Sequence, residues 1–247
     1  MKTVRFIIGI FLFLVFLIPV SGITAEEIIK EIDRNKISST QEFRAKMFIK
    51  KDNKVLEKEY TGFGQEEGEK FFITFTNAED LGVKYLKIED ELWIYFPDAD
   101  DVMKISGHML RQGMMGSDVS YEDMMDLDKL EEKYDSELLG EETINDSLCY
   151  KIKSTAKTDD VTYYSQELWV DKKTFVVLKM DLYAKSGRLL KQIQQFNIQK
   201  FDNKYYALNM TIQDMRKKDT LTTMEIIEIK FDIKIPENTF TKQNLYR

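Results

Sequence analysis

The sequence predicts a mainly β fold with some helix, in which a curved antiparallel sheet forms an open, incomplete β-barrel closed by a helical lid. Apolar residues alternate with period two along most of the chain, and short turn signals separate these runs. One long break near the middle changes to a helical period. Closely spaced hairpins make the sheet antiparallel, because parallel strands need crossover segments. The natural twist of about ten or eleven strands curls such a sheet.

The first 22 residues predict a cleaved secretory signal. Lys2 and Arg5 precede a nearly unbroken apolar run over 6–20, and small residues follow, with cleavage expected after Gly22. A retained membrane anchor is the alternative, but the run is shorter than the roughly 20 residues that span a bilayer. We therefore expect one domain over 23–247, exported to the periplasm, or to the outside of a cell that has no outer membrane.

Composition narrows the classes of partner. The net charge is −7, so the surface repels phosphate backbones and nucleic acid is not expected as a ligand. The same charge disfavours a broad attraction to anionic lipid head groups, so lipid contacts must be made by apolar side chains. Cys149 is the only cysteine, which excludes an intramolecular disulfide and leaves stability to packing.

A helix is expected at the start of the mature chain. Thr24 and Glu27 have the spacing of a capping box, and the helix is expected to end near Asn35. Its apolar face consists of Ile28, Ile29 and Ile32.

Strands follow the helix. The clearest period-two runs cover 43–49, 71–76, 92–96, 148–152, 176–182, 206–213 and 227–231. Turn signals such as Asp52-Asn53 and Ser186-Gly187 separate neighbouring runs. The concave apolar face of the curled sheet must be covered, and only the N-terminal helix and the break over 106–134 are available to cover it.

The break over 106–134 is rich in methionine. Half of the 12 methionines of the chain lie between Met103 and Met125. Methionine is flexible and polarizable, which suits a surface that binds variable acyl chains. Ser120 and Asp123 have the pattern of a helix start. The alternative is that these methionines simply fill the core beneath a long loop.

This region carries a family resemblance. The segments Leu92–Pro97 (LWIYFP), Val102–Gly107 (VMKISG) and Met115–Asp123 (MGSDVSYED) resemble, in order and spacing, the central signature of the LolA-like outer-membrane lipoprotein-sorting proteins. The resemblance implies an open β-barrel with a helical lid and an apolar cavity that carries lipoprotein or lipid acyl chains. It also implies an inner-membrane transporter and an outer-membrane acceptor as partners.

The sequence departs from the family pattern at one point and matches it at another. Asp98, Asp100 and Asp101 stand where members of this branch usually have basic residues, which weakens any claim about a head group or a docking partner. The Gly-Ser-Asp element of the family corresponds to 116–118, and we interpret it as part of the lid.

The candidate site residues fall into two groups. The residues expected in the cavity and lid are Phe71, Ile73, Phe75, Leu92, Ile94, Phe96, Met103, Met109, Leu110, Met114, Met115, Met124 and Met125. The residues expected at lid hinges and at the helix cap are Gly107, Gly113, Gly116, Ser117, Asp118, Ser120 and Asp123.

The sequence does not predict catalysis. His108 is the only histidine, so no histidine-based metal site can form, and no Gly-x-Ser-x-Gly motif accompanies it. We expect no catalytic residue, metal or cofactor, and a monomer. A hydrolase would require His108 or a carboxylate pair at the mouth of the cavity.

Two non-enzymatic functions remain open. The first is a carrier of lipid or lipoprotein acyl chains. The second is a periplasmic module that senses lipid or lipoprotein and regulates a membrane-anchored partner. Such regulators usually carry an added C-terminal domain, whereas this sequence ends soon after its last predicted strand, which favours the carrier.

Overall fold

The computed structural model describes residues 22–35, 40–65, 69–125 and 130–247. The predicted signal over 1–22 lies, except for Gly22, outside the described residues. Within the described ranges, no helix has both the length and the apolar character needed to cross a membrane.

Helix α1 (Ala25–Asn35) opens the described chain and has the predicted cap. The backbone N–H of Thr24 donates to the Glu27 carboxylate at 2.8 Å, and the N–H of Glu27 donates to the Thr24 hydroxyl at 3.2 Å. Ile28, Ile29 and Ile32 are buried on one side of the helix, as their spacing predicts.

The first half of the sheet is a meander. Its strands are β1 (Thr40–Lys51), β2 (Lys54–Gln65), β3 (Lys70–Phe75), β4 (Lys84–Ile88), β5 (Glu91–Phe96) and β6 (Asp101–Ile105). A short 3-10 helix, η2 (Ala78–Asp80), lies between β3 and β4. Each of these strands pairs antiparallel with the next.

The predicted break follows β6 and is helical, as expected. It contains η3 (Gly107–Arg111), η4 (Met114–Gly116), α2 (Tyr121–Met125) and α3 (Leu130–Lys133). We call residues 106–125 the lid. Ser120 and Asp123 cap α2 as predicted, because each backbone N–H donates to the side chain of the other, at 2.6 and 3.3 Å.

The second half of the sheet is also a meander and returns toward the first. Its strands are β7 (Tyr134–Ile144), β8 (Ser147–Ala156), β9 (Ser165–Asp171), β10 (Val177–Tyr183), β11 (Leu189–Phe201), β12 (Lys204–Asp214) and β13 (Thr220–Phe231). The C-terminal segment ends in α4 (Lys242–Leu245).

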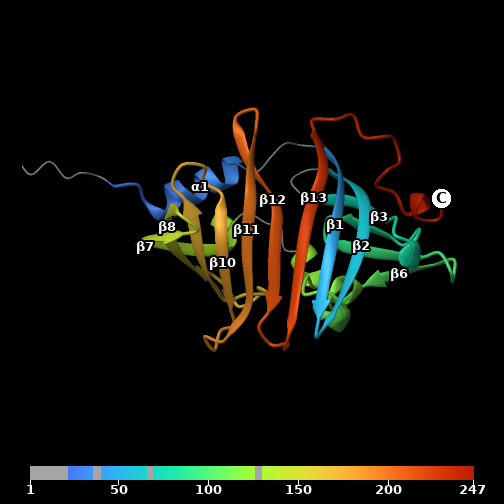
Figure 1. The fold of residues 1–247 in the computed structure, drawn as a ribbon, viewed down its shortest axis with the longest axis horizontal. Helices are drawn as coiled ribbons and strands as arrows, with labels where there is room; N and C mark the ends of the chain where they lie inside the picture. The colour runs from blue at the N-terminus through green and yellow to red at the C-terminus, as the bar shows by residue number, and fades with distance from the viewer. Residues whose placement is uncertain (1–21, 36–39, 66–68, 126–129) are drawn as a thin grey trace, which may run out of the picture.

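The strands form one antiparallel sheet of 13 strands in the order β6-β5-β4-β3-β2-β1-β13-β12-β11-β10-β9-β8-β7. The first and last strands pair at its centre, with Gln41 opposite Phe231. The sheet is not closed, because β6 and β7 remain as its two edges (Figure 1). The predicted open, curved sheet is thus confirmed.

The expected number of strands, about ten or eleven, was too low. Edge strand β7 is exposed at most of its positions, and only Tyr134 at its start is buried. Edge strand β6 buries only Ile105. Strands with so little burial need not alternate apolar and polar residues, so the period-two signal is weak in them.

Both faces of the sheet carry apolar clusters. We call the face that packs against α1 and the lid the inner face. On it, β1 to β6 pack against the lid around Met47, Phe75 and Tyr85. On the outer face, the C-terminal segment covers Trp93, and Leu245 is fully buried there. Coverage of both faces explains why the segment 71–75 is apolar at nearly every position.

Candidate functional site: an apolar cavity beneath a polar-latched lid

A cavity of about 220 Å³ lies between the inner face at the centre of the sheet and the lid. Strands β1, β12 and β13 supply most of its wall, and Met114, Val119 and Met124 line it from the lid side. The sheet residues that line it are Gln41, Phe43, Ala45, Tyr60, Ile73, Tyr206, Ala207, Leu208, Asn209, Met210, Met224, Ile226 and Ile229. Its lining is therefore mainly apolar, with Gln41, Asn209 and two tyrosines as the polar members.

A β-bulge shapes the cavity wall. Strand pairing aligns Phe43 with Ile229 and Ala45 with Ile226, with the irregularity between Arg44 and Ala45. The extra residue on β13 lets Ile226 and Ile229 both line the cavity although they are three positions apart. A regular strand would have put one of these two isoleucines on the outer face.

The part of the lid above the cavity is a compact loop. The N–H of Met114 donates to the carbonyl of Val119 at 2.7 Å, and Gly113 forms a β-bridge with Ser120. A side chain at Gly113 would lie 2.1 Å from the Ser117 carbonyl oxygen, so this position requires glycine for close packing. Gly116 has a φ of +78°. The loop thereby places Met114 and Val119 side by side over the sheet.

A tyrosine pair fixes the lid against the first half of the sheet. The hydroxyls of Tyr85 and Tyr121 lie 3.4 Å apart, and both side chains are buried. Burial, together with the neighbouring Tyr121, raises the pKa of Tyr85. The Tyr85 phenol therefore keeps its proton at physiological pH, and the two hydroxyls are placed to share a hydrogen bond.

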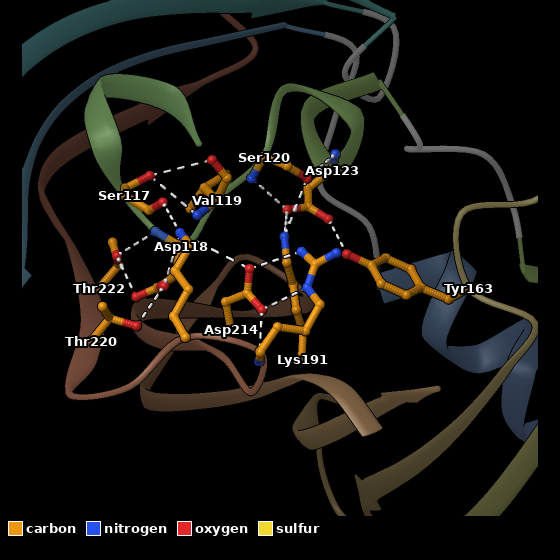
Figure 2. A network of polar contacts seen from close by, with 12 residues as sticks. Ser117, Asp118, Val119, Ser120, Asp123, Tyr163, Lys191, Asp214, Thr220 and Thr222 are labelled. Carbon is orange, nitrogen blue, oxygen red and sulfur yellow. Dashed lines mark hydrogen bonds and ion pairs between the residues drawn. The ribbon is translucent and has the colours of Figure 1, made fainter. Parts of the chain in front are cut away.

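Asp118 joins the lid to the hairpin between β12 and β13. Only 2% of Asp118 is exposed, yet its carboxylate accepts hydrogen bonds from Thr220 at 2.9 Å and Thr222 at 3.2 Å. Its backbone N–H donates to the Thr222 hydroxyl at 2.8 Å. Lys217 donates to the Ser117 carbonyl at 2.9 Å and lies 3.3 Å from the Asp118 carboxylate. Figure 2 shows these contacts converging on one side of the lid loop.

Asp123 joins the lid to β11 in the same network. Lys191, only 1% exposed, forms an ion pair with the Asp123 carboxylate and donates to the Ser120 hydroxyl at 3.2 Å. Tyr163 donates to the other oxygen of Asp123 (Figure 2). Burial and the charge of Asp123 raise the pKa of Tyr163, which keeps its proton for this bond. We call the contacts of Asp118 and Asp123 with the sheet the latch.

Asp214 braces the latch from the end of β12. Its carboxylate accepts two hydrogen bonds from the Arg216 guanidinium, both at 2.8 Å, and lies 4.0 Å from Lys217. Burial acts to raise the pKa of Asp214, but the hydrogen bonds and charge of Arg216 outweigh burial, and the net pKa is lowered. Asp214 is therefore a carboxylate at neutral pH, and it orients both cations.

The predicted cavity and lid residues are brought together in the cavity or in the inner-face cluster, with two exceptions. Ile73, Met114 and Met124 line the cavity itself. The inner-face cluster includes Phe71, Phe75, Leu92, Ile94, Met109, Leu110, Met115 and Met125. The exceptions, Phe96 and Met103, are 37% and 36% exposed.

The predicted hinge and cap residues divide between the latch and the lid backbone. Asp118, Ser120 and Asp123 belong to the latch, and Ser117 is fully buried beside it. Gly113 is held by close contact, whereas Gly107 and Gly116 have positive φ and open space around them.

Sequence reasoning did not single out two groups of residues. The first is the cavity wall on β12 and β13, including Met210 and Met224. Alternation revealed these strands but not which face meets the lid. The second is the set of latch partners on the sheet, with Lys191 foremost. The only sequence signal at Lys191 is a lysine in a strand of mixed polar and apolar residues, and lysine is typical of exposed positions.

Neither His108 nor Cys149 lines the cavity. Within them, no group of three or more His, Cys, Asp or Glu side chains is placed to hold a metal ion. His108 is exposed in η3 and does not line the cavity. Cys149 is buried, and burial raises the pKa of its thiol to about 11, which makes it a packing residue.

Solved structures with the same architecture clarify the fold. A DUF1329 family protein from Desulfovibrio piger is 27% identical with a TM-score of 0.81, over 90% of this chain and 97% of that chain. A structure described as an outer-membrane lipoprotein-sorting protein domain, from Vibrio parahaemolyticus, is 22% identical with a TM-score of 0.78. The match covers 90% of this chain and 100% of that chain. A LolA superfamily protein from Nitrosomonas europaea is 22% identical with a TM-score of 0.71, over the same shares.

Two further comparisons use the sequence. No curated protein matches it significantly. A family model with the description "Uncharacterized protein" matches residues 67–247, which is most of the chain. The chain therefore belongs to that family, and its fold is the LolA-like fold of an open, lidded sheet.

Proposed function

We propose that this chain is a carrier that takes up an acyl chain of a lipid or lipoprotein in the cavity beneath the lid. The observation that carries the proposal is the combination of an apolar cavity with a cover that is attached by polar contacts. Methionine contributes to the wall from both sides, through Met114 and Met124 on the lid and Met210 and Met224 on the sheet. Such side chains adapt to acyl chains of different length and bend.

The size of the cavity implies movement. Its volume of about 220 Å³ is below the roughly 300–1,000 Å³ of typical small-molecule sites. A long acyl chain therefore needs more space than the cavity has here, and movement of the lid away from β12 and β13 would supply that space. Burial of one methylene contributes about 0.8 kcal/mol, so a long chain is held by on the order of 10 kcal/mol. Release then requires a partner that supplies competing contacts or stabilises the open lid.

The proposed setting is extracytoplasmic. The N-terminal pattern of Lys2, Arg5 and the apolar run over 6–20 supports export, and an acyl carrier is needed where lipid must cross water between membranes. In this setting, an inner-membrane transporter loads the chain and an outer-membrane acceptor unloads it. The function needs binding and release and no catalytic group.

Uptake of a fluorescent long-chain fatty acid and of a diacylated lipopeptide tests the proposal. We expect saturable binding, and we expect Met114→Gln to weaken it about tenfold, because an unpaired amide in an apolar site costs about 1–3 kcal/mol. Met103→Gln is the matched control, since Met103 is 36% exposed and does not line the cavity. Failure of both probes to bind, together with no lipid in mass spectra of the native protein, would refute the carrier function.

A further inference from the structure

A second pocket lies beside the lid and differs in character from the acyl cavity. Its volume is about 320 Å³, and its polar lining comes from Arg111, Ser120, Glu122, Thr162, Tyr163 and Arg216. Helix α2 contributes to both sites, because Met124 lines the acyl cavity and Glu122 lines the second pocket. We call the second site the polar pocket.

The latch beside the polar pocket is electrically balanced. Asp118 is paired with Lys217, Asp123 with Lys191, and Asp214 with Arg216. These pairs leave no surplus charge of either sign for a ligand. A net charge in the polar pocket must therefore come from groups outside these pairs, although the Arg216 guanidinium keeps one terminal nitrogen that its bonds to Asp214 do not use.

Arg111 and Glu122 are the charged groups outside the latch. Within the described part of the chain, neither side chain forms an ion pair or a side-chain hydrogen bond, and the two do not pair with each other. The polar pocket thus presents one uncompensated cation and one uncompensated anion to the same space. A guanidinium binds phosphate through parallel N–H donors, and a carboxylate binds an ammonium group.

We propose that the polar pocket binds a zwitterionic head group that carries a phosphate and an ammonium, of the phosphoethanolamine type. Arg111 binds the phosphate, and Glu122 binds the ammonium. Arg216 assists Arg111 with the one terminal nitrogen of its guanidinium that does not bond to Asp214. A zwitterion has no net charge, so the net charge of −7 on the chain does not repel it as it would an anion. The proposed function supplies the source of this head group, a cargo phospholipid, but the site stands on its own contacts.

Binding at the polar pocket is linked to the lid. Arg111 and Glu122 belong to the lid, whereas Arg216 follows β12 and Tyr163 precedes β9. A ligand that contacts both sides cross-links the lid to the sheet next to the latch. Occupation of the polar pocket therefore stabilises the closed lid, by the differential affinity of the ligand for the closed and open states.

Calorimetric titration of the full chain tests the site with two zwitterionic probes and one anionic probe. The zwitterions are glycerophosphoethanolamine, which has no acyl chain, and dihexanoyl phosphatidylethanolamine below its micelle concentration. The anion is glycerophosphoglycerol. We expect Arg111→Gln to weaken both zwitterions about tenfold, which corresponds to about 1.4 kcal/mol. Arg34→Gln, on the exposed face of α1, is the matched control and should leave binding unchanged.

Glu122→Gln separates a zwitterion site from a simple anion site. It should weaken the zwitterions but strengthen glycerophosphoglycerol, because it removes the ammonium partner and also a negative charge. If glycerophosphoethanolamine binds, the polar pocket accepts a soluble zwitterion without acyl chains. If only the dihexanoyl lipid binds, the polar pocket is specific for the head group of a lipid. Absence of binding by both zwitterions, or affinities that Arg111→Gln leaves unchanged, would overturn the inference. Fatty acid uptake measured in parallel distinguishes that failure from failure of the carrier function.

Discussion

The two covers of the inner face, α1 and the lid, are attached by different kinds of contact. Helix α1 packs Ile28, Ile29 and Ile32 against β8, β9 and β10, in a cluster that includes Ile152 and Leu168. Its polar anchor is Asn35, which donates to the Thr174 carbonyl at 3.0 Å and accepts from the N–H of Tyr205 at 2.7 Å. This half of the inner face is a closed apolar core.

The lid combines apolar packing with the latch. It buries Met114, Val119 and Tyr121, and Asp118 and Lys191 add polar contacts between the lid and the sheet. Water cannot replace an apolar contact without cost, whereas it can replace hydrogen bonds one for one, so their net contribution is small. We therefore expect α1 to be the fixed cover, and we expect the lid, which depends more on polar contacts, to be the cover that moves.

Truncation of Ile28 should give the largest effect. Ile28 is fully buried on the sheet side of α1, so Ile28→Ala is expected to lower the global free energy of unfolding by about 3 kcal/mol. Lys30→Ala on the same helix is the control, because its pair with Glu131 is half-exposed and is worth well under about 1 kcal/mol. Chemical denaturation measures both. If hydrogen exchange shows lost protection only in the amides of α1 while the global free energy of unfolding is unchanged, α1 is a separable cover like the lid.

Removal of the Lys191 ammonium should give an intermediate and local effect. Lys191→Met leaves Asp123 without its cation, but the Asp123 side chain is 20% exposed, so water compensates for part of the loss. We expect the free energy of opening the lid to fall by about 2 kcal/mol. Hydrogen exchange should accelerate over 113–125 and stay unchanged in α1. Lys185→Met is the control, since its pair with Asp159 is exposed. Equal acceleration in both covers would mean that they open together.

Acidification should give the smallest effect and should act through Asp214. Because the folded-state pKa of Asp214 is below its ordinary value, its contribution to stability is complete above about pH 5 and is lost as the pH falls through about 4 toward the folded pKa. The difference in unfolding free energy between the wild type and Asp214→Asn should therefore shrink between about pH 5 and 3. A difference that stays constant over this range would exclude Asp214 as the pH-sensitive brace of the latch.

The sequence predicted the fold well because the fold depends on local patterns. Alternation gave the strands, the Thr24 and Glu27 pattern gave the cap of α1, and Ser120 with Asp123 gave the start of α2. The cavity wall and the latch depend on contacts between distant segments. Lys191 meets Asp123 only because the lid folds back over β11, and nothing near Lys191 in the sequence indicates a buried partner.

Glycine in the lid illustrates the same limit. Three glycines predicted hinges, since glycine permits conformations that other residues avoid. At Gly113 the cause is instead the nearby carbonyl of Ser117, which leaves no space for a side chain. That contact exists only in the folded loop, so composition could not distinguish a rigid glycine from a mobile one.

The pairing of β1 with β13 has a consequence for folding. Each half of the sheet is a meander whose neighbouring strands are also neighbours in sequence, so both halves can form through rapid local contacts. The contact between Gln41 and Phe231 joins nearly the two ends of the described chain and carries a large loop-closure cost. The cavity beneath the lid spans this seam, with Phe43 on one side and Ile229 on the other. The cavity therefore forms only after β13 has docked on β1, so a folding intermediate that has both meanders but lacks this pairing has no cavity.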